Sequence, residues 1–110
     1  MTSHWQCLVV CGALLLTGCQ GDDAPPTKKA DGKTLFSHYC ADCHGPSGNG
    51  KFLQGIPPNA KTRLTRQEVV NLLLYGRDDM PAMPKFRDRL TPIQAGKVAD
   101  HLLFTLKSSD

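Results

Sequence analysis

Apolar residues recur at three- and four-residue steps in the C-terminal half of the chain, and nowhere do they alternate as in a β-strand. A capping box at Thr65-Arg66-Gln67-Glu68 predicts a helix that ends near Gly76. Thr91 as N-cap, with a proline at the first helical position, predicts a last helix through Leu106. One face of this last helix is apolar, at Ala95, Val98, Ala99, Leu102, Leu103 and Leu106. The pattern predicts an all-α fold.

A separate apolar run covers residues 8–16 and closes with the small residues Thr17 and Gly18 before Cys19. It is too short to cross a bilayer core of about 30 Å, so a secretory signal peptide fits better. Leu16-Thr17-Gly18-Cys19 resembles a bacterial lipobox, in which cleavage leaves the cysteine at the new N-terminus to receive lipid. The alternative is a plain cleaved signal with an incidental cysteine, since residues 1–6 lack the usual Lys or Arg.

These boundaries divide the chain into a signal peptide at 1–18, a tether at 19–30 and one folded domain at 31–110. The tether is polar, contains two prolines and shows no apolar periodicity, as expected of a flexible linker. Its dozen residues reach about 20 Å on average, and about 40 Å when stretched. The tether would let a small domain move near a membrane while staying attached to it.

Composition removes several classes of function. The net charge of +3 is too small to suggest nucleic-acid binding. Of the five cysteines, only Cys40 and Cys43 lie in the folded part, which excludes a multi-disulfide scaffold and a zinc ribbon. A domain of this size buries a modest core, so we expect a further source of stability.

Cys40-Ala41-Asp42-Cys43-His44 is the signature of covalent haem attachment. The two thiols add across the haem vinyl groups, and the histidine directly after them supplies a nitrogen ligand to the iron. The alternative is a thioredoxin-like redox pair, which would follow a strand. No strand-like run precedes Cys40, so the haem interpretation is favoured.

Residues 31–106 resemble a class I cytochrome c. The resemblance rests on Gly32-Lys33-Thr34-Leu35-Phe36 before the motif and on the glycine-rich turn 45–50 after it. It implies three to five short helices around one covalently bound haem c. The first helix, with Asp31 as its N-cap, would pack closely on the last through Gly32 and Phe36, with Ala95 and Ala99 giving room. His101 stands where the family has an aromatic residue, and we expect it to be a packing or surface residue rather than an iron ligand.

The resemblance also implies a methionine as second iron ligand, and Met80 and Met83 lie in a proline-rich loop. Gly76 precedes Met80 by the family's four residues, whereas Met83-Pro84-Lys85-Phe86 resembles the family's Met-Pro-x-Phe run. We expect Met80 to bind the iron and Met83 to pack beside the haem, with Met83 as the alternative ligand. A proline carbonyl should accept a hydrogen bond from His44, and the family spacing favours Pro58 over Pro57.

These residues predict a one-electron carrier that exchanges electrons with redox partner proteins and has no catalytic site or small-molecule substrate. Lipid on Cys19 would hold it at the periplasmic face of a bacterial envelope, with Gln20 favouring the outer membrane. The alternatives are a subunit of a respiratory or dehydrogenase complex, and a haem enzyme or sensor with an open iron position. A basic rim that attracts an acidic partner could be formed by Lys51, Lys61, Arg63, Arg77, Lys85, Arg87 and Arg89.

Overall fold

The computed structural model describes residues 25–109, so the predicted signal peptide, Cys19 and the start of the tether lie outside the described residues. Within this range the chain forms helices and a single isolated bridge between Lys51 and Ile56, with no β-strand. None of these helices is long and apolar enough to span a bilayer. The all-α prediction is confirmed. The elements are α1 (Gly32–Tyr39), α2 (Ala41–His44), the 3₁₀ turns η1 (Phe52–Gln54) and η2 (Asn59–Lys61), α3 (Arg66–Tyr75), α4 (Pro92–Asp100), the π-helix η3 (His101–Leu106) and η4 (Lys107–Ser109).

The three longer α-helices begin at the predicted caps. Asp31 accepts a backbone N–H three residues later at 2.8 Å. At the start of α3, Thr65 and Glu68 satisfy each other's backbone amides at 3.3 and 2.7 Å. Thr91 and Gln94 do the same for α4 at 3.2 and 2.9 Å. These bonds satisfy amides that the helix itself leaves unpaired, so local sequence sets where each helix begins.

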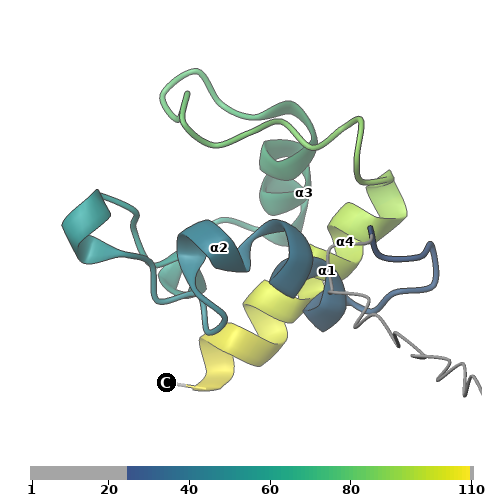
Figure 1. The fold of residues 1–110 in the computed structure, drawn as a ribbon, viewed down its shortest axis with the longest axis horizontal. Helices are drawn as coiled ribbons and strands as arrows, with labels where there is room; N and C mark the ends of the chain where they lie inside the picture. Colours follow the sequence, from purple (N-terminus) through teal and green to yellow (C-terminus); the bar gives the residue numbers. More distant parts are fainter. Residues whose placement is uncertain (1–24, 110) are drawn as a thin grey trace, which may run out of the picture.

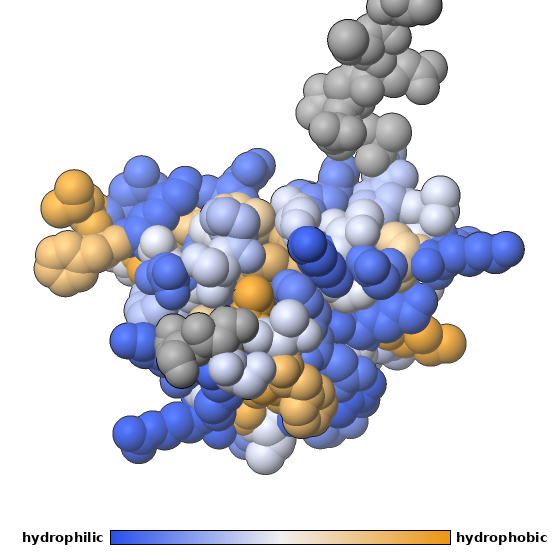
Figure 2. Space-filling model, turned by 90° about the horizontal axis from the view of Figure 1, so that it is seen from below, coloured by the Kyte–Doolittle hydropathy of each residue, from blue (hydrophilic) through white to orange (hydrophobic). Residues whose placement is uncertain are grey.

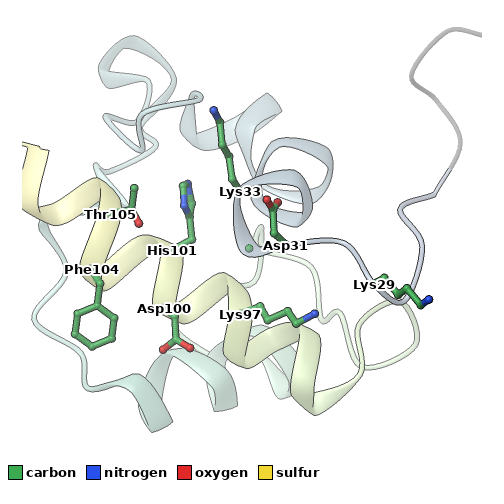
Figure 3. Close-up of a pocket in the computed structure, with 9 residues that line it drawn as sticks. Lys29, Asp31, Lys33, Lys97, Asp100, His101, Phe104 and Thr105 are labelled. Atoms are coloured by element: carbon green, nitrogen blue, oxygen red, sulfur yellow. The ribbon is translucent and has the colours of Figure 1, made fainter.

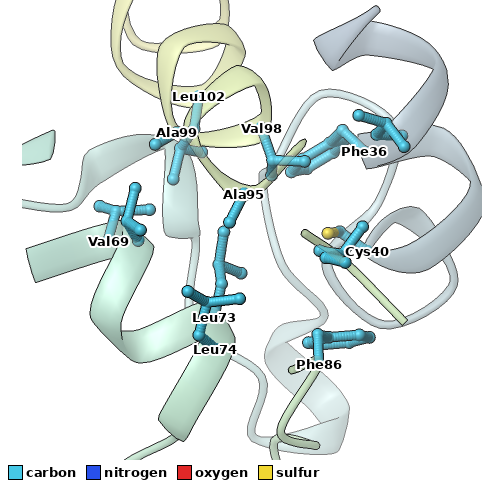
Figure 4. Packing of buried hydrophobic residues seen from close by; sticks show 13 residues of the cluster. Phe36, Cys40, Val69, Leu73, Leu74, Phe86, Ala95, Val98, Ala99 and Leu102 are labelled. Carbon is cyan, nitrogen blue, oxygen red and sulfur yellow. The ribbon is translucent and has the colours of Figure 1, made fainter. Parts of the chain in front are cut away.

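The core lies where α1 and α3 pack against α4 (Figures 1 and 4). Apolar faces of all three helices meet there, as their residue spacing requires. Figure 4 shows Cys40 between Phe36 and Phe86 at the edge of this cluster. The first cysteine of the haem motif is therefore part of the hydrophobic core. The buried cluster comprises Leu35, Phe36, Cys40, Val69, Val70, Leu73, Leu74, Phe86, Leu90, Ala95, Val98, Ala99 and Leu102.

Helix α1 crosses the chain at the junction of α4 and η3. A methyl group added to Gly32 would collide with the backbone carbonyl of Lys97 and lie 3.0 Å from the Cβ of His101. The expected close approach at Gly32 is present, but its partners are Lys97 and His101. Ala95 and Ala99 are instead fully buried in the core. The missing side chain at Gly32 is what lets the two backbones meet.

His101 packs against the ring of Phe36, with 5.5 Å between the ring centroids. The imidazole thus occupies the aromatic position of the family, as expected for a packing residue. At His101 the regular α-helix gives way to the wider π-helix, so the change in helix type coincides with the crossing. Burial here lowers the pKa of His101, the carboxylate of Asp31 opposes that shift, and the charge of Lys33 adds to it.

We expect Gly32→Ala to destabilise the holoprotein by roughly 1–3 kcal/mol, because the added methyl group forces α1 away from the carbonyl of Lys97. Thermal unfolding followed by helix circular dichroism measures the change. Ser37→Ala, at an exposed position of the same helix, should change stability by less than about 0.5 kcal/mol. Equal unfolding temperatures for the two variants would show that the crossing tolerates a side chain.

The His101 crossing should weaken in acid. A histidine whose pKa is lowered by folding binds fewer protons folded than unfolded. Its contribution to stability is therefore present above the ordinary pKa of about 6.5 and is lost as the pH falls below it. His101→Phe should remove this dependence, so urea midpoints of the wild type should drop relative to the variant between about pH 7.5 and 5. His38→Gln is the matched control, and wild-type and His101→Phe curves that stay parallel would contradict the assignment.

Candidate functional site

The haem motif occupies the junction of α1 and α2. The amide of Cys40 closes α1 on the carbonyl of Phe36 at 2.9 Å, and the amide of His44 bonds the carbonyl of Cys40 at 2.9 Å. This single helical turn places Cys40 and Cys43, three residues apart, on one face, with His44 next in sequence. Both thiols are free; Cys40 is buried and Cys43 is exposed. One thiol therefore reaches into the core while the other lies at its rim.

The surroundings of Cys40 do not suit a redox-active thiol. Burial raises the pKa of its thiol to about 12, and the neighbouring Cys43 adds to the shift. A thiolate nucleophile in a redox pair needs a lowered pKa. No β-strand precedes the motif within residues 25–109, as a thioredoxin-like site requires. These apolar surroundings suit a neutral thioether, the bond that Cys40 would form with a haem.

The side chain of His44 is half-buried. Its Nδ1 atom is buried and has no hydrogen-bond partner among the described residues. Burial lowers the pKa of His44, whereas the backbone carbonyl of Pro57 acts in the opposite direction. The facing carbonyl is thus that of Pro57, one residue before the Pro58 that the family spacing favoured. The carbonyl of Pro58 accepts the amide of Lys61 at 3.3 Å instead.

Glycine positions the segment that carries Pro57. Gly50 has φ of 74°, and a side chain there would collide with the carbonyls of Ile56 and Pro57. Its amide bonds the carbonyl of His44 at 2.8 Å. Gly50 therefore contacts both His44 of the motif and the segment that carries Ile56 and Pro57. Only a residue without Cβ fits this left-handed, crowded position.

The loop beyond Gly50 is closed by two backbone bonds between Lys51 and Ile56, at 2.9 and 3.1 Å. The side chain of Lys51 also donates to the backbone carbonyl of Asp42 within the motif. The loop is therefore closed on Lys51, and Lys51 is in turn tied to the Cys40–His44 turn. Backbone geometry, rather than a hydrophobic contact, sets its direction.

Met80 and Met83 lie in the loop between α3 and α4, and both are partly buried. The amide of Met80 bonds the carbonyl of Arg77, and the amide of Met83 bonds the carbonyl of Met80, each at 3.1 Å. Arg77 and Asp79 form a two-pronged ion pair at 2.9 and 2.7 Å at the start of the loop. Met83 packs against the hydrophobic core cluster. Consecutive turns thus hold the two methionines in one short stretch.

Tyr39 and Phe86 join the methionine loop to the haem motif, a link that the sequence analysis did not assign. Their rings meet edge to face with centroids 5.9 Å apart. The amide of Phe86 bonds the carbonyl of Leu73 in α3 at 2.8 Å, and its side chain is buried. Phe86 was visible in the sequence as part of the Met-Pro-x-Phe run. Its contact with Tyr39 of α1 depends on the tertiary fold.

A hollow lies between the first turn of α1 and the α4–η3 segment (Figure 3). Three of its charged side chains have structural roles. Asp31 caps α1, Lys97 donates to the carbonyl of Ala30 at 3.2 Å, and Asp100 pairs with Arg66 at 2.7 Å. The hollow contains neither cysteine of the motif nor either methionine of the loop. We therefore place the functional site at the α1–α2 junction.

The sequence and the fold match known cytochromes. The profile of the family described as cytochrome C oxidase, cbb3-type, subunit III matches residues 27–102. Cytochrome c55X of Pseudomonas aeruginosa is 27% identical over 99 residues, which is 90% of this chain and 82% of that protein. Among solved structures, the KustC0563 c-type cytochrome aligns with a TM-score of 0.56 at 22% identity, over 66% of this chain and 94% of that chain. The c-type cytochrome NirC aligns with a TM-score of 0.53 at 28% identity, over 66% of this chain and 84% of that chain.

The matched range contains the Cys40–His44 motif, the glycine loop and all of α1 to α4. The predicted cytochrome c-like fold is confirmed by the structural neighbours, and the predicted cofactor, covalently bound haem c, follows from the same matches. Electron transfer with redox partner proteins is the function that these relatives share. The chain therefore belongs to the c-type cytochrome family described as cytochrome c oxidase, cbb3-type, subunit III.

Proposed function

We propose that this cytochrome is a membrane-tethered one-electron carrier whose haem iron is held between His44 and Met80 and whose lipid anchor is on Cys19. The proposal is carried by the Cys40–His44 turn, which combines a core-facing thiol with a half-buried imidazole. Haem c supplies the Fe(III)/Fe(II) couple. The residues around it decide its orientation, its access to water and the ease with which it is reduced.

Each residue of the turn has a distinct part. Cys40, which is buried, and Cys43, which is exposed, would hold the macrocycle through two thioether bonds. His44 supplies the nitrogen ligand, and a bond from Nδ1–H to the carbonyl of Pro57 would orient its ring and strengthen its donation to the metal. Nδ1 of His44 is buried and unpaired among the described residues. We therefore assign the carbonyl of Pro57, which acts on the pKa of His44, as its acceptor. The core cluster that includes Cys40 would help to exclude water from the side of the haem that packs against it.

The second ligand comes from the methionine loop. A thioether is neutral and soft, and together with histidine it raises the reduction potential. Met83 packs against the core cluster, which suits a residue lying beside the macrocycle. Met80 is left as the ligand, four residues after Gly76, whose φ of 68° turns the chain out of α3. With His44 and Met80 both holding the iron, no position would be left open for a substrate, as suits an electron carrier.

Replacing the ligand should abolish the weak sulfur-to-iron absorption band of the oxidised holoprotein. We expect Met80→Ala to lose this band, to bind carbon monoxide when reduced and to fall in midpoint potential, because a neutral sulfur ligand favours Fe(II). Met83→Ala is the matched control and should keep the band. Optical spectra with and without carbon monoxide, and redox titration, measure these changes.

Two results would change the assignment. Loss of the band in Met83→Ala alone would make Met83 the ligand. A wild type that lacks the band and binds carbon monoxide would favour a haem enzyme or sensor with an open iron position.

A fixed place in a respiratory complex is a second candidate, favoured by the description of the family profile. Large apolar side chains are exposed at several points of the described domain, including Tyr75, Ile93 and Phe104. A permanent subunit needs a broad apolar interface, whereas a mobile carrier needs a small one. Gentle solubilisation followed by size measurement separates the two, since a carrier should migrate alone.

The proposed lipid anchor can be tested in the native host. Cys19→Ser should abolish incorporation of labelled fatty acid and release the mature protein from the membrane fraction, because the thiol that carries the lipid is gone. Cys11→Ser is the matched control within the same apolar run and should keep both label and location. Density separation of the two membranes then tests the proposed outer-membrane location. A wild type without label would leave a plain cleaved signal.

A further inference from the structure

Two adjacent apolar side chains project from the protein surface into solvent. Phe52 is 93% exposed and Leu53 is 95% exposed, more than any other large apolar side chain in the described domain. Figure 2 shows apolar side chains projecting from the edge of the molecule where Figure 1 places η1. We call this pair the apolar tip. Exposed side chains of this kind are unfavourable in water and commonly mark contact sites.

The apolar tip is held outward by its backbone. The Lys51–Ile56 bridge closes the loop beneath it, and the amide of Gly55 bonds the carbonyl of Phe52 at 3.1 Å. Gly55 has φ of 70°, which lets the chain reverse directly after the tip. The loop is therefore preorganised, so little ordering entropy opposes a docking contact.

The same loop is attached to the iron-binding turn. The amide of Gly50 bonds the carbonyl of His44 at 2.8 Å, and Lys51 donates to the carbonyl of Asp42. A protein seated on the apolar tip is thus brought next to the segment that holds the haem. Since electron transfer needs close approach to the cofactor, this is a useful place for a contact.

The position of the apolar tip argues for a protein rather than the anchoring bilayer as its occupant. Residues 25–30, which lead from the tether, lie at the right-hand edge of Figure 1, and the η1 loop lies at the left-hand edge. The apolar tip therefore lies at the opposite end of the domain from the point where the tether joins it. Attachment through the tether does not by itself bring the tip to the bilayer.

Charge indicates the chemistry of the occupant. Residues 25–109 contain all 13 Lys and Arg of the chain but only 7 of its 10 Asp and Glu, which gives the described domain a net charge of +6. A second copy of the same domain would be repelled, whereas an acidic surface would be attracted.

We propose that Phe52 and Leu53 anchor this cytochrome in an apolar hollow, ringed by carboxylates, on a redox partner protein. The inference rests on the proposed function, because the partner must exchange electrons with the haem. The apolar tip supplies the short-range contact, and the net positive charge of the domain supplies long-range attraction to the carboxylates.

An electrode can stand in for the partner. Holoprotein embedded through its lipid in phosphatidylcholine nanodiscs is exposed to gold coated with a mixed layer of methyl- and carboxylate-terminated thiols. We expect the double variant Phe52→Ser/Leu53→Ser to exchange electrons with this surface roughly tenfold more slowly than wild type, because the apolar anchor is gone. On a purely carboxylate layer the two should differ little. The loss should persist at high salt, which screens charge attraction but not apolar contact.

Phe104→Ser is the matched control, since Phe104 is 69% exposed on η3, away from the tip, and its variant should behave as wild type. Equal rates for the double variant and wild type would overturn the proposal. A changed haem spectrum or midpoint potential in the double variant would also overturn it, because it would mean that Phe52 and Leu53 cover the haem. A redox wave in every protein confirms the electron-carrier function separately, whereas no wave in wild type would remove both proposals.

Discussion

The close contact of α1 with the end of α4 is the constraint on which the rest of this cytochrome depends. Gly32 lets the two backbones meet at Lys97, and the rings of Phe36 and His101 pack beside that point. Because Cys40 ends α1, the crossing also decides where the haem motif enters the core. A shift of α1 would move both thiol positions and the histidine together, so helix packing and cofactor geometry are a single problem in this domain.

Two loops complete the site from opposite ends of the core. The glycine loop is positioned by backbone hydrogen bonds to the motif, and it brings the carbonyl of Pro57 to His44. The methionine loop is positioned by a side chain, Phe86, which is buried against α3 and meets Tyr39 of α1. The glycine loop therefore depends on Gly50 and its backbone hydrogen bonds, and the methionine loop depends on the buried ring of Phe86.

Local signals predicted much of this arrangement. Asp31, Thr65 and Thr91 each begin a helix because a short polar side chain can satisfy amides only a few residues away. The cysteine and histidine spacing predicted the haem site because the reaction with one macrocycle limits the motif to a single turn. The contact between Tyr39 and Phe86 could not be predicted in this way. Those residues are far apart in sequence, and their meeting depends on how three helices pack.

The sequence by itself determined the all-α fold, the helix starts and the haem c cofactor. It also predicts that Cys40 and Cys43 attach the haem and that His44 binds its iron. Each of these depends on residues within a few positions of one another, where bond geometry leaves few alternatives. The tertiary structure alone places the carbonyl of Pro57 where it acts on the pKa of His44, and brings Lys97 and His101 nearest to Gly32. A shift of one proline or one helical turn changes little locally. Only packing between distant segments distinguishes such neighbours, because only there do their side chains and carbonyls meet different partners.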